Sequence, residues 1–206
     1  MDGNVSFAKS FQRSRGAVDV AFRENWLDRL YQSGAAKALL PRSYGSAHEI
    51  VLVNTAGGIT GGDAFRYGCA ADASRILVTT QAAERAYASN TTDIASMRIR
   101  LAAKNGSCLH WLPQETILFD KSRLERTIEV DLDASSECLV LESLVFGRHA
   151  MGEILAECHF NDRWRICRDG KLIHCEAVCL NETITDLLAA CAGAARAQMA
   201  ATQAAG

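Results

Sequence analysis

The chain has 206 residues, 49% of them hydrophobic, and a formal net charge of −2 from 22 basic and 24 acidic residues. This length and composition are typical of one or two globular domains with a substantial core. The charge gives no electrostatic footprint for nucleic acid or an anionic membrane. No run approaches the 18 uncharged apolar residues that indicate a membrane-spanning helix. We therefore expect neither nucleic acid nor a membrane as a partner.

The eight cysteines raise the question of disulfide bonds. The first residues, Met1-Asp2-Gly3, are not basic and no apolar segment follows them, so we expect no secretory signal peptide. The cysteines are scattered and do not form a compact disulfide framework. We interpret them as reduced, mostly buried thiols of a cytoplasmic protein.

In the first quarter of the chain, the alternating segment Ala17–Phe22 predicts a first strand. The apolar residues Val51–Val53 then lead into Asn54-Thr-Ala-Gly-Gly-Ile-Thr-Gly-Gly-Asp63. This loop contains four glycines, Gly57, Gly58, Gly61 and Gly62, and paired glycines indicate positive φ angles or close approach of the backbone. Its exposed backbone could contact a ligand or partner, or the loop could be a tight turn within a sheet.

Known enzyme motifs do not fit the chain. A P-loop requires Lys after its last glycine, where this chain has Asp63, and the Rossmann glycine spacing is absent. The chain also lacks the G-x-S-x-G elbow of hydrolases and the H-E-x-x-H pair of zinc proteases. An enzyme acting on a phosphorylated molecule at this loop is therefore disfavoured.

From Phe65 onward, a unit of alternating strand, polar turn and second strand recurs. The second strands begin at Ile76, Leu109 and Leu139, at spacings of 33 and 30 residues. Asn105-Gly106 and Asp169-Gly170 are strong turn signals, and the latter joins a fourth unit. The pattern predicts a mainly β fold of stacked antiparallel β-hairpins in layered sheets, with few helices.

The C-terminal segment differs in composition. Alanine dominates it, and its larger apolar residues recur at helical spacing: Ile184, Leu187, Leu188, Cys191, Ala195 and Met199. We predict a helix over about 184–202, and divide the chain into a β domain at 1–183 and an Ala-rich helical tail at 184–206.

Four motifs occur in the order found in one known family. They are the loop Asn54–Asp63, Thr79-Thr-Gln-Ala-Ala-Glu84, Trp111-Leu-Pro-Gln-Glu-Thr-Ile117 and Gly147-Arg-His-Ala-Met-Gly-Glu153. Together they resemble the urease accessory protein D family, called UreD or UreH, over roughly residues 10–180. The resemblance fades near Leu180, which implies a shortened C-terminus.

The resemblance implies a β-rich scaffold that is not an enzyme. Such a protein would bind immature urease together with the accessory F protein and the GTP-hydrolysing G protein. It would deliver Ni²⁺ to the urease active site, holding the ion only in transit and without a tightly bound cofactor.

Several acids are candidates for partner contact or for an ion passage. If the hairpins stack in register, the acids Asp63, Glu84, Glu115, Glu142 and Glu153 could lie along one side of the molecule. A file of carboxylates can pass a divalent cation by weak, multi-site binding. Alternatively, they are solvated or salt-bridged edge acids that oppose sheet aggregation. The resemblance supports the passage, because four of these acids, Asp63, Glu115, Glu142 and Glu153, match acid positions of the family motifs.

Arg148, within the last motif, has two interpretations. It could belong to a partner surface, or it could pair with Glu142 or Glu153 at the end of a strand.

A metal site at His174, Cys175 and Cys179 is a further hypothesis, because imidazole and thiolate suit nickel. On a strand, His174 and Cys175 would point to opposite faces, and Cys175 and Cys179 would lie about 13 Å apart at about 3.3 Å per residue. Only a helix would bring the two thiols together. If they do bind, the alternative function is a stand-alone metallochaperone that holds one ion through Cys and His.

Overall fold

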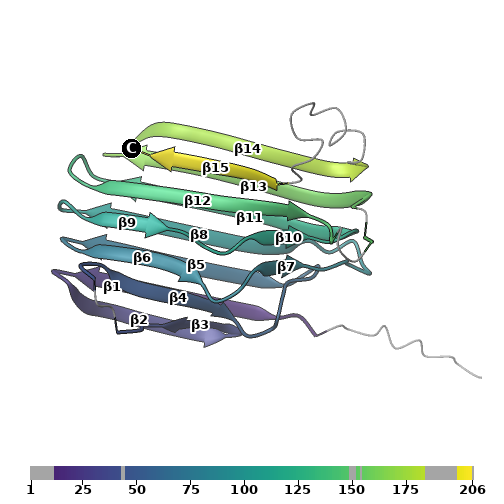
Figure 1. Ribbon diagram of the computed structural model, residues 1–206, viewed down its shortest axis with the longest axis horizontal. Coiled ribbons are helices and arrows are strands. Elements are labelled where there is room, and N and C mark those ends of the chain that lie inside the picture. The colour runs from purple at the N-terminus through teal and green to yellow at the C-terminus, as the bar shows by residue number, and fades with distance from the viewer. Residues whose placement is uncertain (1–11, 43–44, 149–151, 154, 184–198, 206) are drawn as a thin grey trace, which may run out of the picture.

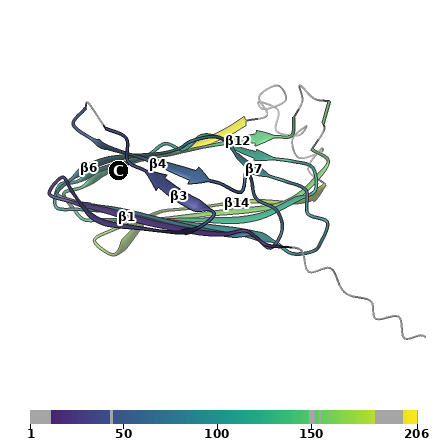
Figure 2. The same ribbon diagram turned by 90° about the horizontal axis from the view of Figure 1, so that it is seen from below.

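The computed structural model describes residues 12–42, 45–148, 152–153, 155–183 and 199–205, which form two stacked β-sheets (Figures 1 and 2). Sheet A contains seven strands, in the order β14 (Lys171–Thr183), β13 (Glu157–Arg168), β11 (Ser122–Leu132), β8 (Ala95–Lys104), β5 (Ala64–Asp72), β1 (Arg15–Arg23) and β2 (Trp26–Gly34). Sheet B follows the order β3 (Ala36–Leu39), β4 (His48–Asn54), β6 (Arg75–Thr80), β9 (Cys108–Trp111), β12 (Glu137–Phe146), β10 (Thr116–Leu118) and β7 (Glu84–Ala86), and β15 (Met199–Ala205) also pairs with β12.

The expectation of stacked antiparallel hairpins is wrong for the three central units. In each of them the first strand lies in sheet A and the second in sheet B, as for β5 and β6. Equivalent strands of successive units then pair in parallel, so Tyr67 aligns with Ile99 and Ile99 with Ile128. The recurrence near 30 residues is therefore one coil of a solenoid-like stack. Local alternation could not reveal this, because both arrangements need the same inward and outward pattern.

Antiparallel pairing occurs in β1–β2, β3–β4, β13–β14 and β12–β15. The predicted first strand is confirmed as β1, and the fourth predicted hairpin is confirmed as β13–β14, with Asp169 and Gly170 both at positive φ in its turn. Sheet A thus has an antiparallel pair at each edge, and its interior strands pair in parallel.

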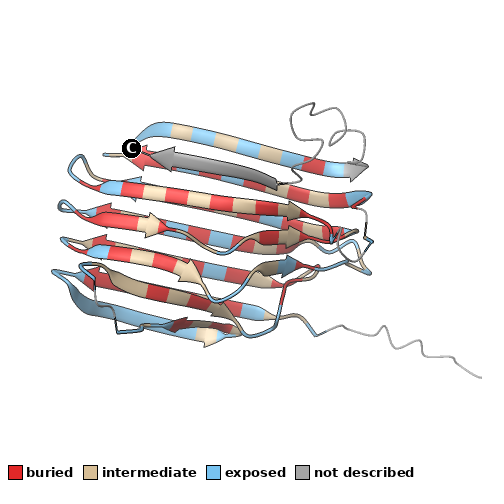
Figure 3. Ribbon diagram, in the orientation of Figure 1, coloured by how far each residue is buried: buried red, intermediate tan, exposed pale blue. Residues whose placement is uncertain are grey.

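The core lies between the two sheets. Along most strands, buried residues that face this layer alternate with more exposed residues that face outward (Figure 3). Ile99 and Ile128 of sheet A and Leu109 and Val140 of sheet B are at most 1% exposed. Burying one such side chain contributes about 1.5–3 kcal/mol. The layer between the sheets is therefore mainly apolar, and a charged residue within it is unusual.

Buried serines connect successive coils where the chain crosses from sheet A to sheet B. The N–H of Ser74 donates to Oγ of Ser107 at 3.1 Å, and the N–H of Ser107 donates to Oγ of Ser136 at 3.2 Å. Each turn thus satisfies backbone groups of its neighbour, which holds the coils in register.

The predicted C-terminal helix falls mostly at 184–198, outside the described residues. Its last residues lie in β15, where Met199 aligns with Val145 of β12 in an antiparallel pair. The boundary at residue 183 between two parts of the chain stays a prediction. The part of the chain that the structure describes contains no helix with the length and apolar character needed to cross a bilayer.

Candidate functional site

Three neighbouring strands of sheet B are interrupted at the same level. Strand β4 gives way to the glycine loop after Asn54, residues 81–83 separate β6 from β7, and residues 112–115 separate β9 from β10. In Figure 1, β6 and β7 lie end to end, and so do β9 and β10. Because the strands are parallel and in register, their interruptions stack and leave an opening in the sheet.

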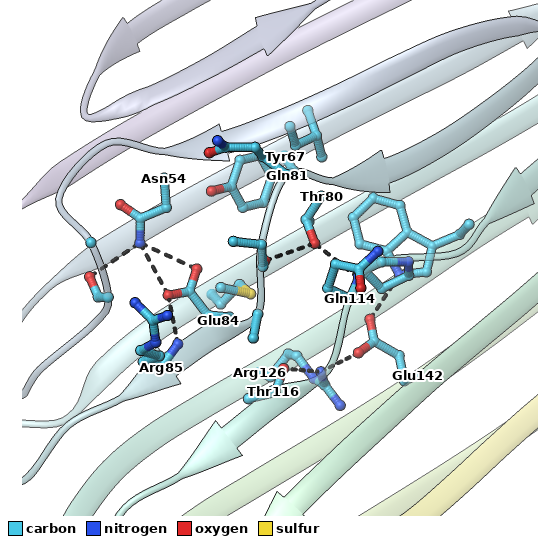
Figure 4. Close-up of a pocket in the computed structure, with 18 residues that line it drawn as sticks. Asn54, Tyr67, Thr80, Gln81, Glu84, Arg85, Gln114, Thr116, Arg126 and Glu142 are labelled. Atoms are coloured by element: carbon cyan, nitrogen blue, oxygen red, sulfur yellow. Dashed lines mark hydrogen bonds and ion pairs between the residues drawn. The ribbon is translucent and has the colours of Figure 1, made fainter.

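A cavity of about 190 Å³ occupies this opening (Figure 4). Its mouth is formed by the interrupted segments of sheet B, whereas Tyr67, Met97 and Arg126 reach it from the inner face of sheet A. The cavity therefore leads from the surface into the layer between the sheets. Its polar lining consists of Asn54, Tyr67, Thr80, Gln81, Glu84, Arg85, Gln114, Thr116, Arg126 and Glu142.

The glycine loop forms one wall of the cavity through Gly57 and Gly58. A Cβ atom on Gly58 would lie 2.3 Å from Cε2 of Tyr87, and one on Gly61 would lie 2.3 Å from the carbonyl oxygen of Asp93. Close approach of the backbone, one of the two expectations from the sequence, therefore accounts for both glycines, and Gly58 also has a positive φ of +153°. Gly62 has a φ of +86°, a region that favours glycine.

Asp63 closes the loop from within. Its carboxylate accepts hydrogen bonds from the N–H of Ser14 at 2.7 Å and from the N–H of Thr60 at 2.9 Å, and the residue is only 5% exposed. Asp63 does not line the cavity. Its position indicates a structural role in holding the loop.

Glu84 and Asn54 meet at the mouth of the cavity although 30 residues separate them. Nδ2 of Asn54 donates to both carboxylate oxygens of Glu84, at 3.1 and 3.2 Å, and also contacts the carbonyl oxygen of Gly58 at 3.1 Å. Burial raises the pKa of Glu84, while the hydrogen bonds from Asn54 and from the N–H of Arg85 oppose that rise. Asp63 is near enough to raise this pKa further.

Deeper in the cavity, Arg126 is held between two carboxylates. Its Nη1 donates to Oε2 of Glu142, while Nε and Nη2 donate to the two oxygens of Asp162 at 3.0 and 2.6 Å. Nε1 of Trp111 donates to Glu142 at 2.7 Å, and Nε1 of Trp164 donates to Asp162 at 3.0 Å. One cation and two acids, all at most 4% exposed, give this cluster one excess negative charge when both acids are ionised.

This environment acts on both partners of the Arg126–Glu142 pair. Burial raises the pKa of Glu142, and the neighbouring Arg126 opposes that rise. For Arg126, the two carboxylates outweigh the effect of burial and raise the pKa of the guanidinium. Arg126 is therefore charged at every physiological pH.

The other predicted acids lie outside the cavity. The backbone oxygen of Glu115 accepts the N–H of Glu84 at 2.9 Å, but the residue does not line the cavity. Of the two partners considered for Arg148, the structure shows Glu153, at 2.7 Å, and the Arg148 guanidinium lies 4.5 Å from the ring centroid of Phe119. The structure thus brings Glu84 and Glu142 to one cavity and does not arrange all five acids in a single file.

The Cys/His hypothesis has unfavourable geometry. Residues 171–183 form strand β14, on which Cys175 and Cys179 are exposed and His174 is half-buried. At about 3.3 Å per residue, four residues of strand separate the two thiols by about 13 Å. Within the described ranges, no group of three or more His, Cys, Asp or Glu side chains is placed to hold a metal ion.

Sequence reasoning missed Arg126, Asn54 and Trp111 as parts of the site. Arg126 carried a readable signal, because it takes an inward position in the alternation Leu124, Arg126, Ile128. A charge at an apolar position implies buried partners. The partners themselves come from other strands and could not be read from the spacing.

Comparison with known proteins identifies the family. Residues 14–205 match the family described as UreD urease accessory protein. The chain is 49% identical over 164 residues to the urease accessory protein UreD of Chelativorans sp. (strain BNC1), covering 78% of this chain and 59% of that protein. It is 47% identical over 167 residues to the urease accessory protein UreD of Jannaschia sp. (strain CCS1), and this match covers 81% of this chain and 62% of that protein. It is also 47% identical over 190 residues to the urease accessory protein UreD of Rhizobium etli, and this match covers 90% of this chain and 69% of that protein.

The chain thus spans about six to seven tenths of the length of these relatives. The family match extends over almost all of the described strands, and the motifs that form the cavity lie within it. This chain belongs to the UreD family of urease accessory proteins.

Proposed function

We propose that this chain acts in the cytoplasm as a scaffold for urease maturation. In this proposal it binds immature urease together with the accessory F and G proteins, and it passes Ni²⁺ toward the urease active site. The observation that carries the proposal is the cavity, which enters through sheet B and ends at the buried Arg126–Glu142 pair. Family membership supports a role in urease maturation, since the relatives are named urease accessory proteins.

The lining of the cavity suits a cation in transit. Its oxygen atoms come from the Glu84 and Glu142 carboxylates, the hydroxyls of Thr80 and Thr116 and nearby amides, and no His or Cys is among the described residues that line it. Nickel binds most tightly to imidazole and thiolate ligands, so oxygen ligands hold it weakly. Weak binding at successive sites is what a passage requires, because an ion held tightly would not leave.

The charges around the cavity slightly favour a cation. Glu84 stands at the mouth beside Arg85, and the Arg126 cluster below has one more acid than base, so these five side chains carry one net negative charge when all three acids are ionised. A divalent cation near Glu84 would favour the ionised carboxylate and release any proton it carries. Because burial raises the pKa of Glu84, we expect cation uptake to weaken as the pH falls toward that pKa.

The test is co-expression with a urease operon that lacks its own D gene. The variants are Glu84→Gln and Glu142→Gln, with Glu137→Gln, an exposed acid of β12, as the matched control. The readouts are urease activity, nickel per urease and the accessory proteins that co-purify.

The proposal expects the unchanged chain and the control to restore activity. Glu84→Gln should lower nickel content and activity together, while urease and the F protein still co-purify. If Glu84→Gln and Glu142→Gln both load nickel like the control, the cavity is not the passage. If the unchanged chain captures neither urease nor an accessory protein, the scaffold role itself is refuted.

A further inference from the structure

A groove of about 470 Å³ lies on the outer face of sheet A, the face that points away from sheet B. In Figure 2, no described strand covers this outer face of the lower layer. Three arginines, Arg15, Arg66 and Arg98, line the groove. The floor between them is made largely of small residues, among them Gly16, Ala17, Gly34 and Ala64.

The arginines are close together and their charges are not balanced. Arg66 and Arg98 are direct register partners on β5 and β8, strands that lie about 4.8 Å apart. Arg15 aligns with Ala64, two residues before Arg66 on the same face of the sheet. Like charges placed opposite each other destabilise a sheet. All three are exposed, and none forms an ion pair with any residue that the structure describes.

Other arginines of this sheet show that pairing is available. Arg29 of β2 binds Asp19 at 2.7 Å, and Arg100 of β8 binds Glu129 at 2.9 Å. Among the described residues that line the groove there are three cations and no acid, which distinguishes it from the paired arginines elsewhere in the sheet. A bound anion would remove the repulsion between Arg66 and Arg98.

The chemistry of the groove favours carboxylates on a protein. A guanidinium binds a carboxylate through two parallel hydrogen bonds, and arginine is enriched in protein interfaces. The small residues leave room for an acidic side chain to reach all three cations. A nucleic-acid backbone would need a long positive track. Asp19 and Glu129, however, both lie in the next register row of the same face, with Gly68 and Arg100 between them, and the whole chain carries a net charge of −2.

We propose that this groove receives an acidic segment of a protein partner. The inference rests on the proposed function for the identity of that partner, which is one of immature urease, the F protein and the G protein. The groove and the cavity mouth belong to different sheets, so a partner docked at the arginines leaves the cavity mouth free. One molecule can then be held by one sheet while a cation enters through the other.

The test uses the full chain co-expressed with urease and the F and G proteins. The groove variant is Arg15→Glu/Arg66→Glu/Arg98→Glu. The matched control is Arg75→Glu/Lys104→Glu/Lys171→Glu, which makes the same change in net charge at exposed positions away from the groove. Thermal unfolding of each variant verifies that it is folded, and Arg15→Gln/Arg66→Gln/Arg98→Gln provides a milder version should the reversal prevent folding.

We expect the groove variant to lose at least tenfold in affinity for one of the three proteins, and the control to lose less than twofold. In the unchanged chain that affinity should fall as salt rises from 50 to 300 mM. Equal binding by groove and control variants would overturn the inference while leaving the scaffold role intact. Tight binding of a 20-base-pair DNA duplex that the groove variant abolishes would also overturn it. Absence of any complex with the unchanged chain would refute the proposed function as well.

Discussion

Replacing Arg126 by Met should destabilise the protein severely, because it leaves two acids buried without their cation. Arg126 is 2% exposed and binds Glu142 and Asp162, which are 4% and 3% exposed. Removing one partner of a buried ion pair costs about 3–5 kcal/mol. Typical domains have a total stability of about 5–15 kcal/mol, so this loss would be a large fraction of the whole.

The companion variant Glu142→Gln removes one charge and keeps the size of the side chain. The two oxygens of Glu142 accept from Nε1 of Trp111 and from Nη1 of Arg126, whereas Gln has one oxygen and an NH₂ group that must face the other donor. Arg126 keeps its two bonds to Asp162, and the cluster then contains one cation and one acid. We therefore expect a loss of about 1–3 kcal/mol, the cost of one buried donor left without its acceptor, which is smaller than the loss for Arg126→Met.

The assay is urea unfolding of both variants and the unchanged chain at pH 5 and pH 8. In the Arg126→Met variant, burial raises the pKa of Glu142 without a cation to oppose it, so the folded state retains a proton that the unfolded state has lost. Stability is then greatest below the unfolded pKa, about 4.3, and decreases as the pH rises through the folded pKa. The deficit of Arg126→Met should be larger at pH 8 than at pH 5. A deficit under 1 kcal/mol, or one that does not change with pH, would refute this reasoning.

Two further predictions concern ionisable groups. Because burial raises the pKa of Glu84, the unchanged chain loses some stability as the pH rises above about 4.3, and Glu84→Gln should remove that part of the slope between pH 5 and pH 8. Urea unfolding measures this slope, and a Glu84→Gln slope equal to that of the unchanged chain contradicts the prediction. In a Cys191→Ser background, a thiol reagent at pH 8 should modify two cysteines rapidly, Cys175 and Cys179, which are exposed. The buried thiols should react only on unfolding, since burial raises the pKa of Cys69 and Cys138 to about 12 and that of Cys158 to about 11. Fast modification of more than two thiols in the folded protein would show that the core is open.

The fold was partly readable from local patterns. Alternation at Phe65, Tyr67 and Cys69 predicted a strand, which is found as β5 with all three side chains buried. The turn at Asp169-Gly170 predicted a hairpin, and β13 and β14 do pair there. Turn length alone does not fix this outcome, because only two residues also separate β5 from β6, which lie in different sheets. Where the turn connects two sheets, as between β5 and β6, the same alternation fits a crossover equally well, and the pairing was predicted wrongly.

The sequence by itself determined that this is a mainly β protein of the UreD family, with a glycine-rich loop that ends in an acid. These properties depend on residue order, side-chain period and backbone freedom, which are local. Only the tertiary structure decided that Glu84 meets Asn54 and that Glu142 meets Arg126, while Asp63 and Glu115 lie outside the cavity. The physical reason is that these contacts follow from the parallel register of successive coils, which stacks three strand interruptions into one opening. Register is set by packing across the whole layer, and no single segment contains it.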